Sequence, residues 1–470
     1  MDAPTATSAG TPPETALGEL GRLVRVGAPV VAAQLAQMGM GMVDTLMLGR
    51  VSAGDLAGAA LGGNVIWPAM ILLMGVLMAV TPTVSQLHGA GRTRETGEVI
   101  RQGAWIALAV ALLIVLLVSR AEHVYRLVGA EADVVPYAVA YVETARWGLP
   151  GVMFYFLFRY LCDGLGQTRP AMYVAFAALG LKALLNWVFV FGQLGVPALG
   201  VVGCGLSTAC TMWFECLAML AIVASPRFRV PTALFERFSP PDRARIGELV
   251  RLGVPIGLTA FFEMACFSLV TLLVARFGAV AVAAQQIAYS INGVVFMLAM
   301  GLGVAATIRV GHELGAGRPE AARRAARVAL TAAAGIGVVA AGGFALGNEL
   351  VAGLFTNDPE VAALAAHLVL FVALYIIVDN TQATAIGALR GYKDTRVPML
   401  VALVGYWVIA LPLGAALGFG WLGEARGVDG FWIGLATGLA CVAVALTLRL
   451  ARLARRQPRP LHTATPGAGP

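Results

Sequence analysis

The chain has 470 residues, of which 59% are hydrophobic and 13% are charged, and its mean hydropathy is +0.80. Soluble domains carry about 25% charged residues, so the composition excludes an ordinary soluble protein and predicts a membrane protein. The net charge of +7 comes from basic residues dispersed among loops without interleaved aromatic residues, which argues against nucleic-acid binding.

Long apolar segments follow one another along the chain, for example GAWIALAVALLIVLLVS at 103–119. They are long enough to cross about 30 Å of hydrocarbon. They show no strict alternation, and lipid requires each backbone polar group to be bonded internally, so we predict helices. The expected fold class is an all-α polytopic membrane protein with about twelve transmembrane helices. We place the helices at 22–49, 60–87, 98–119, 134–161, 170–192, 200–224, 247–276, 282–309, 324–347, 360–389, 396–419 and 430–452.

The ends of the chain and the middle of the sequence are polar. Residues 1–16 have no basic segment followed by an apolar one, so they do not read as a signal peptide, and we expect residues 1–20 to be a disordered tail. Arg and Lys concentrate in one set of loops, in the 226–245 linker and in the basic tail 454–470. The positive-inside rule therefore predicts that both termini and the linker are cytoplasmic.

The sulfur and imidazole side chains show no site pattern. The six cysteines form no CxxC pair, and the five histidines have no HxxxH or HxxE spacing. We expect no transition-metal site and interpret the cysteines as small packing residues. These cysteines are Cys162, Cys204, Cys210, Cys216, Cys266 and Cys441.

The two halves of the chain repeat one another. LVRVGAPV (23–30) matches LVRLGVPI (249–256) and HGAGR (88–92) matches LGAGR (314–318), each at an offset of 226 residues. Three more pairs keep nearly this register: DTLMLGR (44–50) with VTLLVAR (270–276), GLGQTRP (164–170) with GYKDTRVP (391–398), and GVVG (200–203) with GVDG (427–430). The repeat predicts two related structural units.

Each half holds an even number of predicted helices, so both halves have the same orientation in the membrane. We expect an N-terminal lobe at 21–225 and a C-terminal lobe at 246–453, related by a pseudo-two-fold axis along the membrane normal with a cleft between them. Pro29 and Pro255 occupy equivalent places early in each lobe. They mark either the start of a helix or a bending hinge.

Few charged residues fall inside the predicted helices, where each costs about 2.5–3.5 kcal/mol. The mid-helix set is Asp44, Lys182, Glu263 and Asp379. A second set lies nearer the helix ends, where we expect the side chains to anchor the helix by reaching the interface. This set is Arg159, Asp163, Arg309 and Arg390.

In the C-terminal lobe, Tyr375 and Asp379 are four residues apart and share one helix face. Counting from the helix ends places Asp379 within about two turns of Glu263 in depth. Two adjacent carboxylates and a phenol can share a proton or enclose a hard cation such as Na⁺ with oxygen ligands. Either outcome makes Glu263, Asp379 and Tyr375 a coupling-ion site, and the alternative is a buried pair that only locks helices together.

In the N-terminal lobe, Lys182 and Asn186 are again four residues apart. If they face Asp44, the lysine pairs with it and holds it ionised. Soft and aromatic side chains surround the charged positions and are suited to stacking on flat organic cations, although each one alone is ordinary helix packing. The candidates for this substrate cavity are Phe261, Phe262, Phe267, Gln286, Tyr289 and Met297.

These residues lie in motifs that resemble one known family. The motifs are MGMGMVDTLMLG, QLHGAGR, DGLGQTRPAM, LNWVFVFGQLG, GVVGCG, RLGVPIGLTAFFE, VAAQQIA, IRVGHELGAG and ALRGYKDTRVP. Over about residues 20–455 the chain is similar to the multidrug and toxic compound extrusion (MATE) transporters of the NorM branch.

The resemblance implies a twelve-helix antiporter in the inner membrane of a bacterium that exports organic cations in exchange for Na⁺ or H⁺. It assigns the cation site to Glu263, Tyr375 and Asp379, and an essential aspartate of the N-terminal lobe to Asp44. NorM-type sequences have an uncharged polar residue where this chain has Lys182. A tethered ammonium group there puts a second cation site in doubt.

We therefore expect secondary active efflux of ethidium-like or fluoroquinolone-like cations by alternating access, without a cofactor and with the protein as a monomer in the lipid bilayer. The ion and the drug compete for the negative charge at Glu263 and Asp379. The alternative is a flippase for lipid or lipid-linked oligosaccharide, which would need extra helices or a strongly basic cavity. No GxxxxGK[ST] loop and no nucleophile–base pair is visible, which argues against an ATP-driven pump or an enzyme.

Overall fold

The computed structural model describes residues 15–129 and 131–455, and within this part of the chain the regular structure is entirely helical. Eleven helical spans of these residues are long and apolar enough to cross a membrane. The remaining predicted span, 134–161, is divided between α6 (Val135–Ala145), a 3₁₀ turn (Arg146–Gly148) and α7 (Leu149–Gly164). The predicted all-α fold class is confirmed.

The first half of the chain supplies nine helices. Besides α6 and α7 these are α1 (Ala16–Leu48), α2 (Ala53–Leu77), α3 (Val80–Gly89), α4 (Thr96–Val118), α5 (Ala121–Val128), α8 (Arg169–Phe191) and α9 (Gly200–Ala224). Helix α1 begins inside the expected tail 1–20, because Thr15 caps it by accepting a hydrogen bond from the backbone N–H of Gly18. The remaining calls on residues 1–14 and on the basic tail 456–470 lie outside the described residues.

The linker contains a short helix, α10 (Pro226–Thr232), and the second half of the chain then supplies the other lobe. Its elements are α11 (Arg243–Val274), α12 (Ala279–Gly315), α13 (Pro319–Leu346), α14 (Asn348–Gly353), α15 (Pro359–Gly391), α16 (Arg396–Leu403), a π-helical segment (Val404–Ala410), α17 (Leu411–Gly418) and α18 (Gly427–Arg455). Pro29 and Pro255 stand well inside α1 and α11. The helix-start interpretation of these prolines is therefore wrong.

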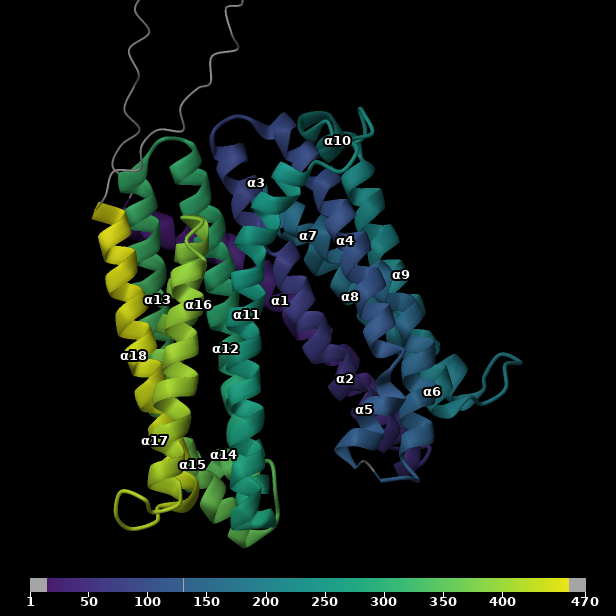
Figure 1. Cartoon of the computed structure of the whole chain (residues 1–470), viewed down its shortest axis with the longest axis vertical. Helices are drawn as coiled ribbons and strands as arrows, with labels where there is room; N and C mark the ends of the chain where they lie inside the picture. The colour runs from purple at the N-terminus through teal and green to yellow at the C-terminus, as the bar shows by residue number, and fades with distance from the viewer. Residues whose placement is uncertain (1–14, 130, 456–470) are drawn as a thin grey trace, which may run out of the picture.

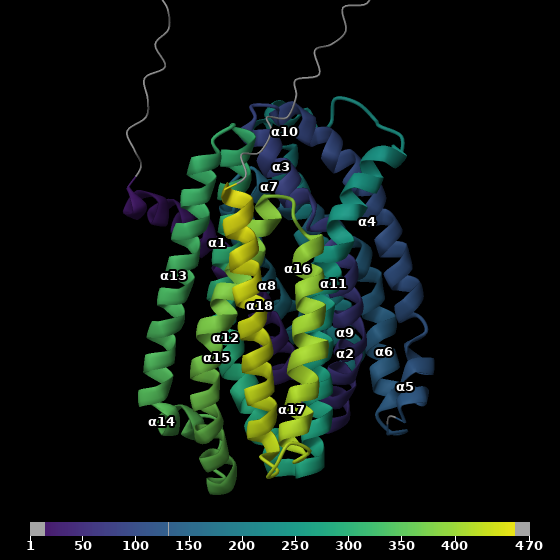
Figure 2. The same ribbon diagram turned by 60° about the vertical axis from the view of Figure 1, so that its left-hand side comes forward.

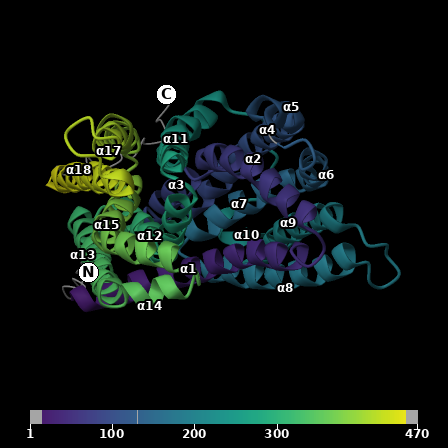
Figure 3. The same ribbon diagram turned by 90° about the horizontal axis from the view of Figure 1, so that it is seen from below.

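The helices form two groups. Figure 1 shows α2 to α9 on one side and α12 to α18 on the other, and Figure 3 shows the same two groups seen along the long axis. Each group has its own buried apolar core. The groups meet at the end where α1 starts and α18 finishes, and they diverge toward α5 and α14 (Figures 1 and 2). We call the first end the termini end.

The internal repeat corresponds to repeated structure. Thr168 of the GLGQTRP motif donates a hydrogen bond to the carbonyl oxygen of Val26 at 2.9 Å, and Thr395 of the GYKDTRVP motif donates one to Leu252 at 3.0 Å. In each lobe the threonine thereby ties the turn before a helix to the lobe's first helix. The repeated motifs are thus explained by equivalent contacts.

Matching contacts also cross between the lobes near the termini end. Gln86 of α3 donates a hydrogen bond to the carbonyl oxygen of Gly391 at 2.9 Å, while Nε2 of His312 on α12 lies 2.8 Å from the carbonyl oxygen of Gly164. Gln86 and His312 are 226 residues apart, so the two contacts are related by the repeat. Glu19 of α1 pairs with Arg309 of α12 in the same region, with both nitrogen–oxygen distances at 2.9 Å.

Four of the cysteines, Cys162, Cys204, Cys216 and Cys266, are buried, as expected for packing residues. Cys210 and Cys441 are exposed on the helix surface. The packing interpretation therefore holds for these four cysteines, whereas Cys210 and Cys441 lie on the surface of their helices.

Candidate functional site

A polar cluster in the C-terminal lobe contains the predicted residues Glu263, which is half-buried, and Asp379 and Tyr375, which are buried. Asp379 is 1% exposed, and its Oδ2 accepts a 3.4 Å hydrogen bond from Asn292 of α12. Glu263 of α11 is close enough to Asp379 for the two carboxyl groups to interact electrostatically. The structure therefore brings together the two acidic residues that the sequence separates by more than a hundred positions.

Tyr406 completes this cluster and was not foreseen from the sequence. Its hydroxyl lies beside the Glu263 carboxyl without normal hydrogen-bond geometry. Tyr406 belongs to the π-helical segment that interrupts the helix between Arg396 and Gly418. Such segments change which face a side chain occupies and often occur at functional sites, and a run of apolar residues gives no signal for one.

Several oxygen atoms of this cluster have no hydrogen-bond partner. The atoms are Oδ1 of Asp379, Oδ1 of Asn292 and the hydroxyl groups of Tyr375 and Tyr406. Buried polar atoms are normally satisfied, so this set of convergent oxygens is suited to a further ligand. Carboxylate, amide and phenol oxygens are the donor types that a hard cation prefers, and the same carboxyl groups can bind a proton.

Aromatic rings pack around the cluster. The ring of Phe267 lies 5.2 Å from Tyr289, 6.2 Å from Tyr375 and 6.5 Å from Tyr406, measured between centroids. Trp432 of α18 lies 5.6 Å from Tyr289 and 5.9 Å from Tyr375. Phe267, Tyr289 and Trp432 therefore pack against the tyrosine rings of this cluster. Trp432 was missed because it is typical of a core residue in an apolar helix.

The other predicted cavity residues are half-buried or exposed to the surroundings of the protein. Phe261 is 37% exposed and packs on Phe262 at 6.3 Å between centroids, and Met297 is half-buried on α12. Gln286 is exposed, whereas its neighbour Gln285 is buried and donates a hydrogen bond to the Tyr289 hydroxyl at 2.9 Å. The glutamine that joins the aromatic cluster is therefore Gln285.

The N-terminal lobe holds a separate cluster around Asp44. Lys182 Nζ lies 3.0 Å from Asp44 Oδ1, and Asn186 donates a hydrogen bond to the same oxygen at 2.6 Å. The ammonium group also donates to Ser207 at 3.0 Å and to Thr208. The ammonium group of Lys182 is thus surrounded by oxygen atoms, which are the kind of ligand that a bound monovalent cation would need.

We expect Lys182→Ala to destabilise the protein strongly, because removing one partner of a buried ion pair typically costs about 3–5 kcal/mol. Asp44 keeps 19% of its side-chain surface exposed, so the loss should fall toward the low end of that range. The double variant Lys182→Ala/Asp44→Asn should recover part of the loss because no unpaired charge remains. Thermal unfolding of the detergent-purified protein measures both effects, and an unchanged melting temperature for Lys182→Ala would contradict the pairing.

The charged residues expected to reach the interface behave differently. Arg159 and Asp163 are 5% and 2% exposed and lie 3.7 Å apart. Arg309 pairs with Glu19 and with Glu313. These side chains are held inside the protein near the contact between the lobes, so the expectation that they reach the membrane interface is wrong for them.

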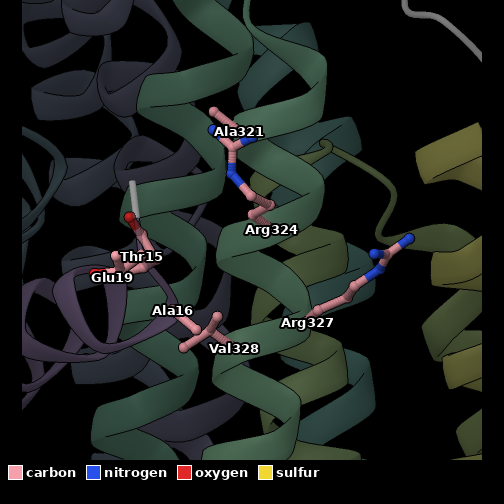
Figure 4. A pocket seen from close by; sticks show the side chains of 7 residues that line it. All are labelled: Thr15, Ala16, Glu19, Ala321, Arg324, Arg327 and Val328. Atoms are coloured by element: carbon pink, nitrogen blue, oxygen red, sulfur yellow. The ribbon is translucent and has the colours of Figure 1, made fainter. Parts of the chain in front are cut away.

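Two small cavities lie outside these polar clusters. One, of about 130 Å³, is formed where Thr15 and Glu19 of α1 approach Arg324 and Arg327 of α13 (Figure 4). The other, of about 310 Å³, lies between Glu98 of α4 and linker residues 237–240. Neither is lined by a predicted site residue, so the candidate site remains the C-terminal cluster with the Asp44 cluster opposite.

The chain is similar to proteins named as multidrug resistance proteins over nearly its whole length. The MatE family pattern matches residues 29–188 and 255–416. Multidrug resistance protein PmpM of Pseudomonas aeruginosa is 42% identical over 440 residues, which cover 93% of this chain and 92% of that protein. Multidrug resistance protein MdtK of Yersinia pestis is 40% identical over 438 residues, covering 93% and 96%.

Solved structures share the fold. The eukaryotic MATE transporter AtDTX14 superposes with a TM-score of 0.82 at 20% identity, covering 94% of this chain and 99% of that one. The Vibrio cholerae MATE transporter VcmN in its bent form gives a TM-score of 0.83 at 19% identity, covering 94% and 98%.

Proposed function

The chain belongs to the MatE family of membrane transporters, and from this we propose that it is a multidrug efflux antiporter that exports organic cations in exchange for inward Na⁺ or H⁺. One observation carries the proposal: half-buried Glu263 and buried Asp379 lie together in a cluster with unpartnered oxygens. Two adjacent carboxyl groups can hold a cation, and a drug cation and a small ion then compete for the same negative charge.

The two lobes supply the conformational part of the mechanism. Their contacts lie near the termini end, which we assign to the cytoplasm on the basis of the Arg and Lys distribution. The described conformation is therefore closed toward the cytoplasm. Binding of Na⁺ or H⁺ to Glu263 and Asp379 weakens their hold on the drug, and the lobes then rock to expose the site to the cytoplasm.

The membrane potential can drive this exchange. Each net inward charge supplies about 2.3 kcal/mol per 100 mV, which corresponds to roughly a fifty-fold drug gradient. Relatives named as multidrug resistance proteins support a drug substrate, and the aromatic rings beside the carboxyl groups are suited to flat cations.

Ethidium export from cells tests the proposal. Cells that lack their own multidrug transporters and express this chain should retain less ethidium than cells expressing Glu263→Gln. The exposed loop variant Glu424→Gln is the matched control and should export like wild type. Equal retention by wild-type cells and cells without the protein would contradict the drug-efflux function, and movement of a fluorescent lipid analogue in its place would point to a flippase.

We expect the cross-lobe hydrogen bonds of Gln86 and His312 to stabilise the cytoplasm-closed state. Each is worth about 1 kcal/mol, so Gln86→Ala and His312→Ala should each shift the closed-to-open ratio by roughly fivefold, and the double variant by more. Electron–electron double resonance between spin labels at Leu127 and Leu354, both exposed and carried on the diverging ends of the lobes, measures this ratio after Cys210 and Cys441 are replaced by Ser. Unchanged distance distributions would contradict the assignment.

A further inference from the structure

Glu215 is a buried carboxyl group that the proposed ion site does not use. It lies in the middle of α9 and is 2% exposed. Gln37 of α1 donates a hydrogen bond to its Oε1 at 2.6 Å. A charged group at this depth is costly to insert into a membrane, and intramembrane acidic residues commonly serve transport of ions or protons.

The side chains that face Glu215 come from α1 and α7. Arg159 acts on it electrostatically, but the ion pair of Arg159 is with Asp163. The Tyr155 hydroxyl is also near and has no hydrogen bond of normal geometry. Arg159 and Tyr155 are the titratable groups that act on the Glu215 carboxyl, and Asp163 is next to them as the ion-pair partner of Arg159. Within residues 15–129 and 131–455 no ion pair is formed by Glu215 itself.

Three buried atoms of these neighbours have no hydrogen-bond partner: Nε of Arg159, which pairs with Asp163 only at 3.7 Å, Oδ1 of Asp163 and the hydroxyl of Tyr155. The cluster therefore has unused hydrogen-bonding capacity around a carboxyl group, as the C-terminal cluster has. Gln37 is itself only half-buried, so Glu215 lies one side chain away from the accessible surface of α1. A proton can reach it by that route.

The repeat relates this cluster to the proposed ion site. Gln37 lies 226 residues before Glu263, the same offset as the strongest sequence matches. The N-terminal lobe thus has an amide at the position of Glu263, and the amide contacts a carboxyl group contributed by α9. Two other acidic residues inside this lobe already have a basic partner: Asp44 is paired with Lys182, and Asp163 with Arg159. Glu215 forms no such pair among the residues that the structure describes.

We propose that Glu215 is a proton-binding site of the N-terminal lobe, which takes a proton from water as the carboxylate and returns it from the carboxylic acid. The proposal that Glu215 exchanges a proton rests only on the burial and the contacts of this side chain. Its use in the transport cycle rests on the proposed antiport function. Both lobes then carry a protonatable carboxyl group, Glu263 on α11 in one lobe and, in the other, Glu215 on α9 in contact with Gln37, the repeat equivalent of Glu263.

Infrared difference spectroscopy of the lipid-reconstituted protein tests proton exchange without any substrate. A step in pH should change a carboxyl C=O band in wild type, and Glu215→Gln should lose that component. Glu215→Asp should keep a titrating band at a shifted position, which also guards against misfolding of the amide variant. The exposed control Glu424→Gln should keep the wild-type band, and an unchanged spectrum for folded Glu215→Gln would overturn the proposal.

Transport then tests the role of the exchange. In proteoliposomes with a pH gradient, Glu215→Gln should move fewer protons per ethidium than wild type. A lost infrared band with an unchanged proton-to-ethidium ratio would overturn the role in transport. If wild type fails to move ethidium, the proposed antiport function is contradicted. The infrared experiment then decides by itself whether Glu215 exchanges a proton.

Discussion

Glu263→Gln and Asp379→Asn are each expected to abolish ethidium transport driven by an ion gradient. The two carboxyl groups interact across α11 and α15, and the site offers them a single amide hydrogen bond, from Asn292. Replacing either one removes the negative charge for which ion and drug compete, so the gradient can no longer drive the drug. The amides keep the size of the side chains, so the loss should come from charge and not from packing.

Thermal unfolding of the detergent-purified variants shows whether they are folded, and ethidium exchange at equal concentrations then shows whether they still bind the drug without a gradient. Variants that are folded should bind and exchange ethidium weakly or not at all in the absence of a gradient, while the Glu424→Gln control matches wild type in both assays. Gradient-driven transport at the wild-type rate by either variant would move the coupling site elsewhere, first to Asp44 or Glu215.

Gly257→Val and Gly75→Val are expected to disfavour the described conformation, in which α2 of one lobe contacts α11 of the other. Helices α2 and α11 cross there in backbone contact: a Cβ atom on Gly75 would lie 2.1 Å from Cα of Gly257, and one on Gly257 would lie 2.3 Å from the carbonyl oxygen of Leu72. Backbone atoms cannot yield as a flexible side chain can, so the helices must move apart. Overpacking costs about 1–3 kcal/mol or more, which shifts the equilibrium roughly 5- to 150-fold away from the described conformation.

The spin-label distances between Leu127 and Leu354 report this shift directly, and ethidium export should fall with it. Gly335→Val in α13 is the matched control, because a Cβ atom there meets nothing within 4 Å. Wild-type distances and export by Gly257→Val would show that the two helices do not need this close approach.

The sequence was sufficient to predict the helices and the two-fold repeat because both depend on local composition and on spacing along the chain. It was insufficient at Pro29 and Pro255, since a proline early in an apolar segment does not show how far the helix extends before it. The start of α1 depends on a capping contact of Thr15, which lies in a polar segment that carries no apolar signal.

The acidic pair and the contact of Lys182 with Asp44 could be anticipated because charged residues are rare in these helices. Tyr406 and Trp432 could not, since aromatic residues are common in apolar helices and their convergence depends on tertiary packing and on a π-helical segment. Glu215 did carry a signal, a lone acid in the apolar segment TMWFECLAML. Its role could not be inferred from the sequence, because the contact between Glu215 and Gln37, the repeat equivalent of Glu263, depends on tertiary packing.

Ethidium uptake into inside-out proteoliposomes tests the central claim of ion-coupled export most directly. A Na⁺ gradient is imposed at equal pH, and then a pH gradient is imposed without Na⁺, with wild type beside Glu263→Gln and Asp379→Asn. We expect at least one gradient to drive uptake by wild type and neither gradient to drive uptake by the two variants. Absence of uptake by wild type under both gradients would contradict the central claim, and so would uptake that survives in both variants.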